Sequence, residues 1–385
     1  MKATFNNNDL AYAVNVVHTI VNPQSSLPIL SNILIDARIN GEVELVASDL
    51  ETCVRCTIPA DVAAEGKLTV PASKLVDIVR VVPEDNVFME QEENRLKIQC
   101  LSNTYRLAVM PPEEFPQWAE IEPVVSFSIP QKMLKRNINK ILFAIPQREP
   151  RRVLLGGLFR LKDDKLICVG TDGKKLGYAE SPITDLKGKK KNEAIVPQKV
   201  LVELARICGD EGEARIHLGE RQISVDLGKV KIVTSMIEGK YPEFELVIPK
   251  QFAYNIKANK PPLADAVRRA AIISEEKTHA IMFKFQTDRA LLSAVSFDVG
   301  SYEGMIPVEY KGEDLEVAFN HKFLQEIIRS VDSDNVIIKV KTSEEPIIIN
   351  GDDEPDYFFL IMPITFIETP ETGYSADEAE EDSES

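Results

Sequence analysis

The hydrophobic and polar positions of this chain follow one pattern that is repeated three times. In each copy an apolar strand, a short polar turn and a second apolar strand end at a small residue beside an acid. The copies occupy residues 27–49, 151–172 and 279–298. Their landmarks Asp49, Asp172 and Phe297 stand 123 and 125 residues apart. A repeat of this length indicates three similar domains rather than one large core.

A second block follows each copy and predicts a helix. Pro71, Pro197 and Asn320 each precede an amphipathic stretch, and alternating strands come after it. Each repeat also opens with a helix of period 3.6, as the spacing of Leu10 and Val14 illustrates. The six predicted helices cover residues 9–21, 72–82, 131–143, 198–208, 262–273 and 321–331.

These elements predict an α+β fold of three domains, each with two helices packed on antiparallel sheets. The first two domains end in similar segments, EFPQW and YPEFE, whose prolines Pro116 and Pro242 are 126 residues apart. The predicted domains are residues 1–123, 124–249 and 250–366, followed by a tail at 367–385.

The net charge of −16 is unevenly distributed along the chain. The tail holds eight acidic residues and no basic one, so it carries half of the net charge and is expected to be disordered. The six predicted helices contain 12 basic and 5 acidic residues, a net charge of +7. A basic stripe on one helix is ordinarily a solvated face. Because five of the six helices share the bias, we interpret it as a surface that binds phosphates without reading a base sequence.

Other features argue against membrane insertion, metal binding and catalysis. The chain start lacks a signal-peptide pattern and no apolar run approaches the ~20 residues that cross a bilayer, so we expect a soluble cytoplasmic protein. Cys53 and Cys56 would point to opposite faces of a strand, which suits neither a zinc site nor a redox helix. The four histidines are isolated, and no nucleophile, P-loop or zinc-protease motif is present, which disfavours an enzyme. A scaffold that binds proteins alone is the other alternative, and the basic helices disfavour it.

Short motifs in a fixed order carry a resemblance to a known family. They are LPIL, SDLE, VPASKL, FP, TDGKKL, YP, FN and MPI, which begin at residues 27, 48, 70, 115, 171, 241, 319 and 362. In this order, inside a threefold repeat, they are specific, and over residues 1–366 the chain resembles the beta sliding clamp of bacterial replicative DNA polymerase. The resemblance implies a processivity factor that forms a closed head-to-tail dimeric ring, with helices lining a hole for duplex DNA. It implies no catalytic activity, no cofactor and no metal.

The implied partners are double-stranded DNA without sequence preference, replicative and other DNA polymerases, the clamp loader, and other clamp-binding replication and repair proteins. A peptide pocket between the second and third domains would comprise Leu154, Thr171, Gly173, Lys174, Lys175, Leu176, Pro242, Val247, Asn320, Phe323, Leu360, Met362, Pro363 and Ile364. Taken singly, the leucines and the valine of this set would equally fit ordinary core packing.

Two further sets of residues are expected at the DNA and at the ring seam. The DNA contacts would combine helix cations with two loop residues: Gln24, Lys74, Arg80, Lys132, Lys135, Arg136, Lys140, Arg151, Lys199, Arg206, Arg268, Arg269, Lys322 and Arg329. The dimer seam would use Lys74, Tyr105, Leu107, Ile272, Ile273 and Glu303.

Three departures from the family pattern bear on these sites. The family usually has arginine at Lys175 and often a cation at Leu246, so the polar contacts of the pocket are expected to differ. The loop at 22–26, an implied DNA contact, carries the uncharged Gln24. The acidic tail continues past the usual end of the family, and we hypothesise that it competes with peptides for the pocket.

Overall fold

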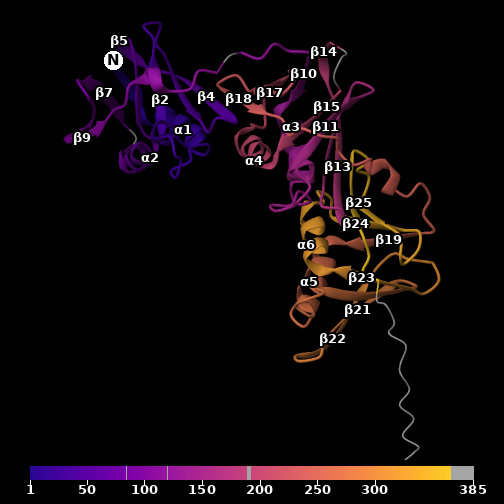
Figure 1. Ribbon diagram of the computed structural model, residues 1–385. Helices are drawn as coiled ribbons and strands as arrows, with labels where there is room; N and C mark the ends of the chain where they lie inside the picture. The colour runs from indigo at the N-terminus through magenta and orange to yellow at the C-terminus, as the bar shows by residue number, and fades with distance from the viewer. Residues whose placement is uncertain (84, 119, 189–191, 366–385) are drawn as a thin grey trace, which may run out of the picture.

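The computed structural model describes residues 1–365 except 84, 119 and 189–191, and the predicted acidic tail lies outside these residues. The chain is curved into an arc, with the helices on its concave side and the sheets on its convex side (Figure 1). The described residues form six α-helices: α1 (Asn7–His18), α2 (Ala72–Val81), α3 (Gln131–Leu142), α4 (Gln198–Ile207), α5 (Lys260–Ala271) and α6 (His321–Ser330). The six predicted helices are therefore confirmed, although α1 ends three residues early and α5 begins two residues early.

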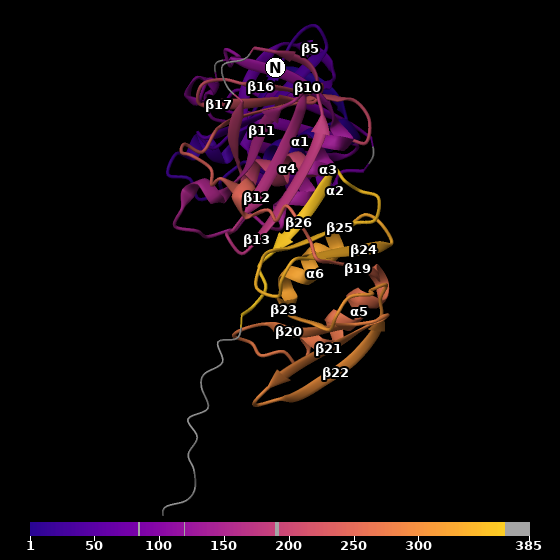
Figure 2. The ribbon, with the colours of Figure 1, turned by 90° about the vertical axis from the view of Figure 1, so that its right-hand side faces the viewer.

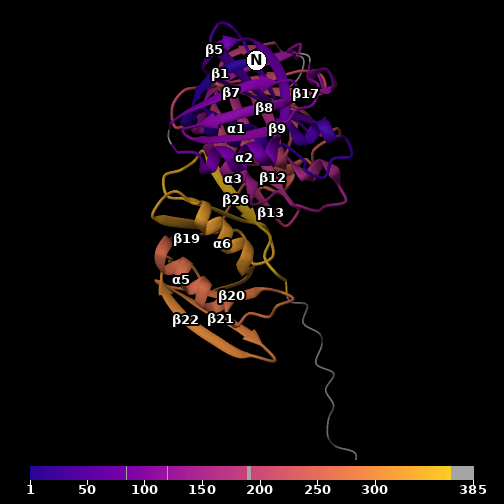
Figure 3. The ribbon, with the colours of Figure 1, turned by 90° about the vertical axis from the view of Figure 1, so that its left-hand side faces the viewer.

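Two sheets lie at the ends of the arc (Figure 3). Sheet A has the order β5-β1-β7-β8-β9, with β5 (Asp61–Ala64), β1 (Lys2–Asn6), β7 (Asn86–Glu92), β8 (Arg95–Cys100) and β9 (Asn103–Ala108). Sheet D has the order β22-β21-β20-β23, with β22 (Gly300–Pro307), β21 (Arg289–Ser296), β20 (Ala280–Gln286) and β23 (Leu315–Asn320). Strands β9 and β22 are thus free edges at opposite ends of the chain.

The other two sheets are each shared by two domains. Sheet B joins the first and second domains in the order β14-β10-β16-β17-β18-β4-β3-β2-β6, with β14 (Thr184–Lys187), β10 (Val125–Pro130), β16 (Glu213–Leu218), β17 (Gln222–Asp226), β18 (Val230–Ser235), β4 (Thr52–Pro59), β3 (Glu42–Ser48), β2 (Asn32–Ala37) and β6 (Gly66–Pro71). Sheet C joins the second and third in the order β15-β11-β12-β13-β26-β25-β24-β19, with β15 (Glu193–Pro197), β11 (Gly156–Lys162), β12 (Lys165–Thr171), β13 (Lys175–Pro182), β26 (Tyr357–Ile361), β25 (Ile347–Gly351), β24 (Asn335–Val340) and β19 (Tyr254–Asn259).

Each domain junction is therefore a backbone ladder. At the first junction β4 pairs with β18, and Val54 lies opposite Ile232. At the second, β13 pairs with β26, and Gly177 lies opposite Phe359 (Figure 2). Both ladders are antiparallel, as are the other strand pairs of the described residues, which confirms three α+β domains built on antiparallel sheets.

The helices pack on the sheets through the apolar stripe that the sequence predicts. On α3 the side chains of Leu134, Ile138 and Ile141 are fully buried at spacings of four and three residues. The opposite face of the helix carries Lys132 and Lys135 and is left to solvent. The same construction in α2 to α6 puts basic positions on the concave side of the arc, whereas α1 carries no lysine or arginine.

Two connecting segments cover the face of the sheets that is turned away from the helices. Residues 110–118 cross sheet B, where Phe115 and Trp118 pack with Val46 and Cys53. Residues 237–247 cross sheet C, where Tyr241 and Phe244 pack with the leucines and valine of that face. We call these the first and second covering segments. The second includes the turn η4 (Phe244–Val247).

No helix of the described residues is long and apolar enough to cross a membrane. Cys53 and Cys56 are buried free thiols on opposite faces of β4, since Cys53 packs under the first covering segment and Cys56 in the helix-covered core. Within the described residues no group of three or more histidine, cysteine or acidic side chains is arranged to hold a metal.

Candidate functional site

The predicted DNA-contacting cations differ in whether an acidic side chain pairs with them. Among the described residues, six of them have no acidic side chain within ion-pair distance: Arg80, Lys132, Lys135, Arg269, Lys322 and Arg329. Lys132, Lys135 and Arg329 line a hollow of about 410 Å³ between α3 and α6, together with Arg136, Asn139, Lys140, Ser330 and Asp332. An open hollow with unpaired cations on two helices is suited to a phosphate group.

Two of the predicted cations are instead joined to an aspartate of the next domain. Lys140 is 3% exposed, its Nζ lies 2.7 Å from Oδ1 of Asp332, and it also donates to the carbonyl of Ser330. Burial lowers the pKa of Lys140, while the carboxylate opposes that shift. Although burial works against its charge, hydrogen bonds from Lys140 and Arg136 hold the pKa of Asp332 below its ordinary value. These contacts join α3 to the third domain, which argues against direct phosphate binding by Lys140.

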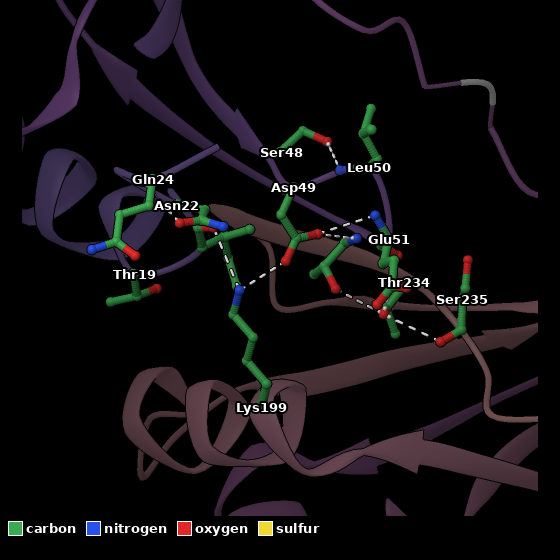
Figure 4. A network of polar contacts seen from close by, with 12 residues as sticks. Thr19, Asn22, Gln24, Ser48, Asp49, Leu50, Glu51, Lys199, Thr234 and Ser235 are labelled. Atoms are coloured by element: carbon green, nitrogen blue, oxygen red, sulfur yellow. Dashed lines mark hydrogen bonds and ion pairs between the residues drawn. The ribbon is translucent and has the colours of Figure 1, made fainter. Parts of the chain in front are cut away.

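Lys199 makes a similar contact at the first junction. Its Nζ lies 2.7 Å from Oδ2 of Asp49, and the other oxygen of that carboxylate accepts from the backbone N–H of Thr52 at 2.7 Å (Figure 4). Lys199 also donates to the carbonyl of Ile20, which places the start of α4 beside the loop that carries Gln24. Four further predicted cations have an acidic partner close by in the sequence. Lys74 lies near Asp77, and Arg206, Arg268 and Arg151 form ion pairs with Glu203, Asp265 and Glu149.

A pocket opens at the second junction, on the side of sheet C away from the helices. It has a volume of about 130 Å³ and is lined by Arg151, Leu154, Thr171, Gly173, Lys174, Lys175, Leu176, Pro242, Glu243, Phe244, Val247, Leu360 and Met362. The turn between β12 and β13 shapes one wall, because the Thr171 hydroxyl accepts from Gly173 N–H at 3.0 Å and donates to the Lys175 carbonyl. Gly173 has φ +89°, a backbone conformation that favours glycine.

Ten of the fourteen predicted pocket residues line this pocket, and four do not: Asn320, Phe323, Pro363 and Ile364. Asn320 caps α6 by accepting from the N–H groups of Lys322 and Phe323. Arg151, expected at the DNA, is placed on the pocket wall instead. Glu243 and Phe244 were missed, although the shared pattern of EFPQW and YPEFE marks Phe244 as the counterpart of Trp118.

Lys175 lines the pocket with part of its side chain, but its ammonium group points to the domain junction. The residue is 8% exposed, and its Nζ lies 2.6 Å from Glu326 Oε2 on α6. The same nitrogen stands 4.5 Å from the ring centre of Phe323 and 5.3 Å from that of Phe143. Lys175 therefore links the pocket to a helix of the concave face.

The predicted seam residues lie at the two ends of the arc. Tyr105 and Leu107 are partly buried on the free edge β9, and Glu303 is on the free edge β22. Ile272 follows α5 and is 74% exposed, whereas Ile273 is partly buried against the core. These apolar positions beside unpaired strand edges are typical of an interface.

The repeated domains, the basic concave face and the small junction pocket together define the sliding-clamp fold. Comparison with known families agrees: models of the DNA polymerase III beta subunit match its N-terminal domain at residues 1–119, its central domain at 128–243 and its C-terminal domain at 245–365. The chain belongs to this family, the beta sliding clamps. Its members are non-catalytic processivity factors of DNA polymerase III.

Relatives match over nearly the whole chain. The beta sliding clamp of Chlamydia pneumoniae is 29% identical over 365 residues, which span 94% of this chain and 99% of the relative. A crystal structure of a sliding clamp from Pseudomonas aeruginosa bound to griselimycin has a TM-score of 0.91 at 28% identity, covering 95% of this chain and 100% of that one. The beta subunit structure from Thermotoga maritima has a TM-score of 0.88 at 25% identity, with the same coverage of both chains.

Proposed function

We propose that two copies of this chain close head to tail into a ring around duplex DNA and slide along it without sequence preference. Through its junction pocket the ring holds DNA polymerases, the clamp loader and other replication and repair proteins. The observation that carries this proposal is a rule of strand pairing. Strands at corresponding positions of neighbouring domains pair at both domain junctions, and the same rule leaves the edge strands β22 and β9 as a matching pair whose outer edges have no partner among the described residues.

The rule follows from the internal repeat. When the strands of the repeated domains are matched in order, β4, β13 and β22 occupy the same position in their domains. Strands β9, β18 and β26 likewise correspond to one another. The pairs Val54–Ile232 and Gly177–Phe359 occupy equivalent positions in the two ladders. The same rule pairs β22 with β9 of a second copy and puts Tyr302 opposite Tyr105. Both tyrosines lie on the helix side of their sheets and are partly buried there, as paired residues must share a face.

The charge distribution supports DNA as the occupant of the hole. The helices of the second domain carry six basic residues and one acidic residue, and those of the third carry five and two, whereas those of the first are balanced. Unpaired cations on mobile side chains bind phosphates without fixing a register, which permits sliding. The acidic remainder of the surface repels DNA from the outside of the ring.

The pocket is suited to a short peptide. Its floor is formed by leucines and Val247, and Arg151 and Lys174 supply cations at its border. We therefore expect a peptide that anchors apolar side chains on the floor and presents carboxylates or carbonyl groups to the border.

A crosslinking experiment tests the seam and its register. The rule puts Thr104 of one copy opposite Glu303 of the other. With Thr104→Cys and Glu303→Cys in one chain, a short thiol crosslinker is expected to give covalent dimers. The control combines Thr104→Cys with Glu316→Cys on β23, at the far edge of the same sheet, and is expected to give none. Equal yields from both variants would contradict the proposed register.

Retention on DNA tests encirclement separately. After loading, the ring should remain on circular DNA through gel filtration and be lost once the DNA is linearised. Loss from both forms, or retention on both, would rule out a topological link.

A further inference from the structure

The chain crosses onto the outer face of sheet D, the face turned away from the helices, in the same way as it crosses onto the outer faces of sheets B and C. The N–H of Met110 donates to the carbonyl of Thr69 on β6, and the N–H of Ile237 donates to Ile195 on β15. After the last strand, the N–H of Ile364 donates to Ala318 on β23 at 2.8 Å. Met110, Ile237 and Ile364 are each 127 residues apart. The third domain therefore begins a crossing that in the first two domains becomes a covering segment.

The face that this third crossing would cover is open. Leu34, Leu158 and Met282 occupy the same place in the three repeats, 124 residues apart. Leu158 is fully buried beneath the second covering segment, and Leu34 packs with the first. Around Met282 there is instead a hollow of about 540 Å³, lined also by Leu291, Ser293, Met305, Lys284, Glu303 and Glu316. Met305 is 63% exposed. Met282 and Leu291 are partly exposed beside the exposed Met305, so this sheet face presents apolar side chains that lack a full cover.

The sequence after Ile364 repeats the covering motif in altered form. Pro370 stands six residues after Ile364, and the corresponding prolines Pro116 and Pro242 stand six and five residues after Met110 and Ile237. The aromatic positions that flank the proline in FPQW and YPEF are threonines in TPET. Apolar side chains remain close by at Phe366, Ile367 and Tyr374.

We propose that residues 366–374 form a third covering segment, which lies on the outer face of sheet D with its apolar side chains against Met282 and Met305. The hydrogen bond at Ile364 holds the start of this segment beside the hollow, so its effective concentration there is in the millimolar range. Weak apolar contacts are then sufficient, and a free peptide of the same sequence would compete poorly. The acidic residues after Tyr374 are left outside the apolar face.

This assignment differs from competition for the peptide pocket, and truncation distinguishes the two. If the tail covers sheet D, removing it leaves the affinity of the pocket for a polymerase peptide unchanged. If it occupies the pocket, the affinity rises on truncation, and the present proposal is overturned.

Oxidation of methionine by hydrogen peroxide, read by mass spectrometry, tests the cover directly. Met282 is the reporter because it lies on β20, away from the β22 edge, and Met133 on α3 is the internal control. Three chains are compared: the full chain, one ending at Tyr374 and one ending at Thr365. We expect slow oxidation of Met282 in the first two and several-fold faster oxidation in the third, with Met133 unchanged.

Any one of three other outcomes would overturn the proposal. Equal rates in all three chains would mean that no tail residue covers the face. Fast oxidation in the chain ending at Tyr374 would assign the cover to residues beyond it. Protection that disappears on dilution would assign it to a second copy. Should truncation impair folding, as a faster rate at Met133 would reveal, full-length Phe366→Ser/Ile367→Ser replaces it and is expected to expose Met282 to the same degree.

Discussion

The contact between Lys175 and Glu326 yields an ordered prediction, because its two ends are buried to different extents. The side chain of Lys175 is 9% exposed and that of Glu326 is 43% exposed. Glu326→Gln leaves an ammonium group buried between two phenylalanine rings without its counter-charge. Breaking a fully buried pair in this way costs about 3–5 kcal/mol, and an exposed pair contributes about 1 kcal/mol or less. For this half-exposed pair we expect a loss of about 2 kcal/mol.

Lys175→Met should be milder, although it removes the same ion pair. Methionine keeps the packing against Phe143 and Phe323, and the glutamate that remains has access to water, so we expect a loss below about 1 kcal/mol. The double variant should resemble Lys175→Met. Stability is measured by urea unfolding followed by circular dichroism, with Glu345→Gln in the exposed Lys341–Glu345 pair as a control expected to change little. A larger loss for Lys175→Met than for Glu326→Gln would refute the reasoning.

Three further outcomes follow from the structure. Lys132→Ala should reduce the slope of log affinity for duplex DNA against log salt by about 0.9, whereas Lys140→Met should leave it unchanged, as salt titrations by fluorescence anisotropy will show. Burial raises the pKa of the Cys56 and Cys208 thiols to about 12, so iodoacetamide at pH 8 should label neither until the protein is unfolded; rapid labelling of the native chain would contradict this. Burial lowers the pKa of His321, so the unfolded chain binds the extra proton as pH falls below about 6.5 and stability declines there; His321→Gln should weaken that decline in unfolding titrations.

The periodicity of the sequence predicted the elements well because it records which side of each element is buried. The stripe of Leu134, Ile138 and Ile141 requires a helix with one apolar face, and the structure buries these residues together. The alternation around Cys53 and Cys56 likewise separated the two thiols onto different faces. These inferences depend on neighbours within one element.

The sequence was less informative about side chains at domain junctions. Lys132, Arg136 and Lys140 share one basic stripe, but Asp332 of the third domain engages Lys140 and Arg136 and not Lys132. The direction of the Lys175 ammonium group depends on Glu326, 151 residues away, and no local pattern records such a pairing. Arg151 is placed at the pocket because its loop folds back on Gly173, a contact between segments. The domain boundaries predicted near residues 123 and 249 stay predictions.

The shared sheets have a mechanical consequence. A bending load applied to one chain at either of its internal junctions acts on a continuous ladder of backbone hydrogen bonds, β4 with β18 or β13 with β26. Each junction is held by several backbone hydrogen bonds as well as by the covalent chain, so we expect the arc to resist bending there. In the proposed ring each seam is a ladder of the same kind, but no covalent connection crosses it, so we expect the ring to open at a seam between chains and not within a chain. A loading machine would need to grip only one seam, and the rest of the ring would transmit the force without deforming.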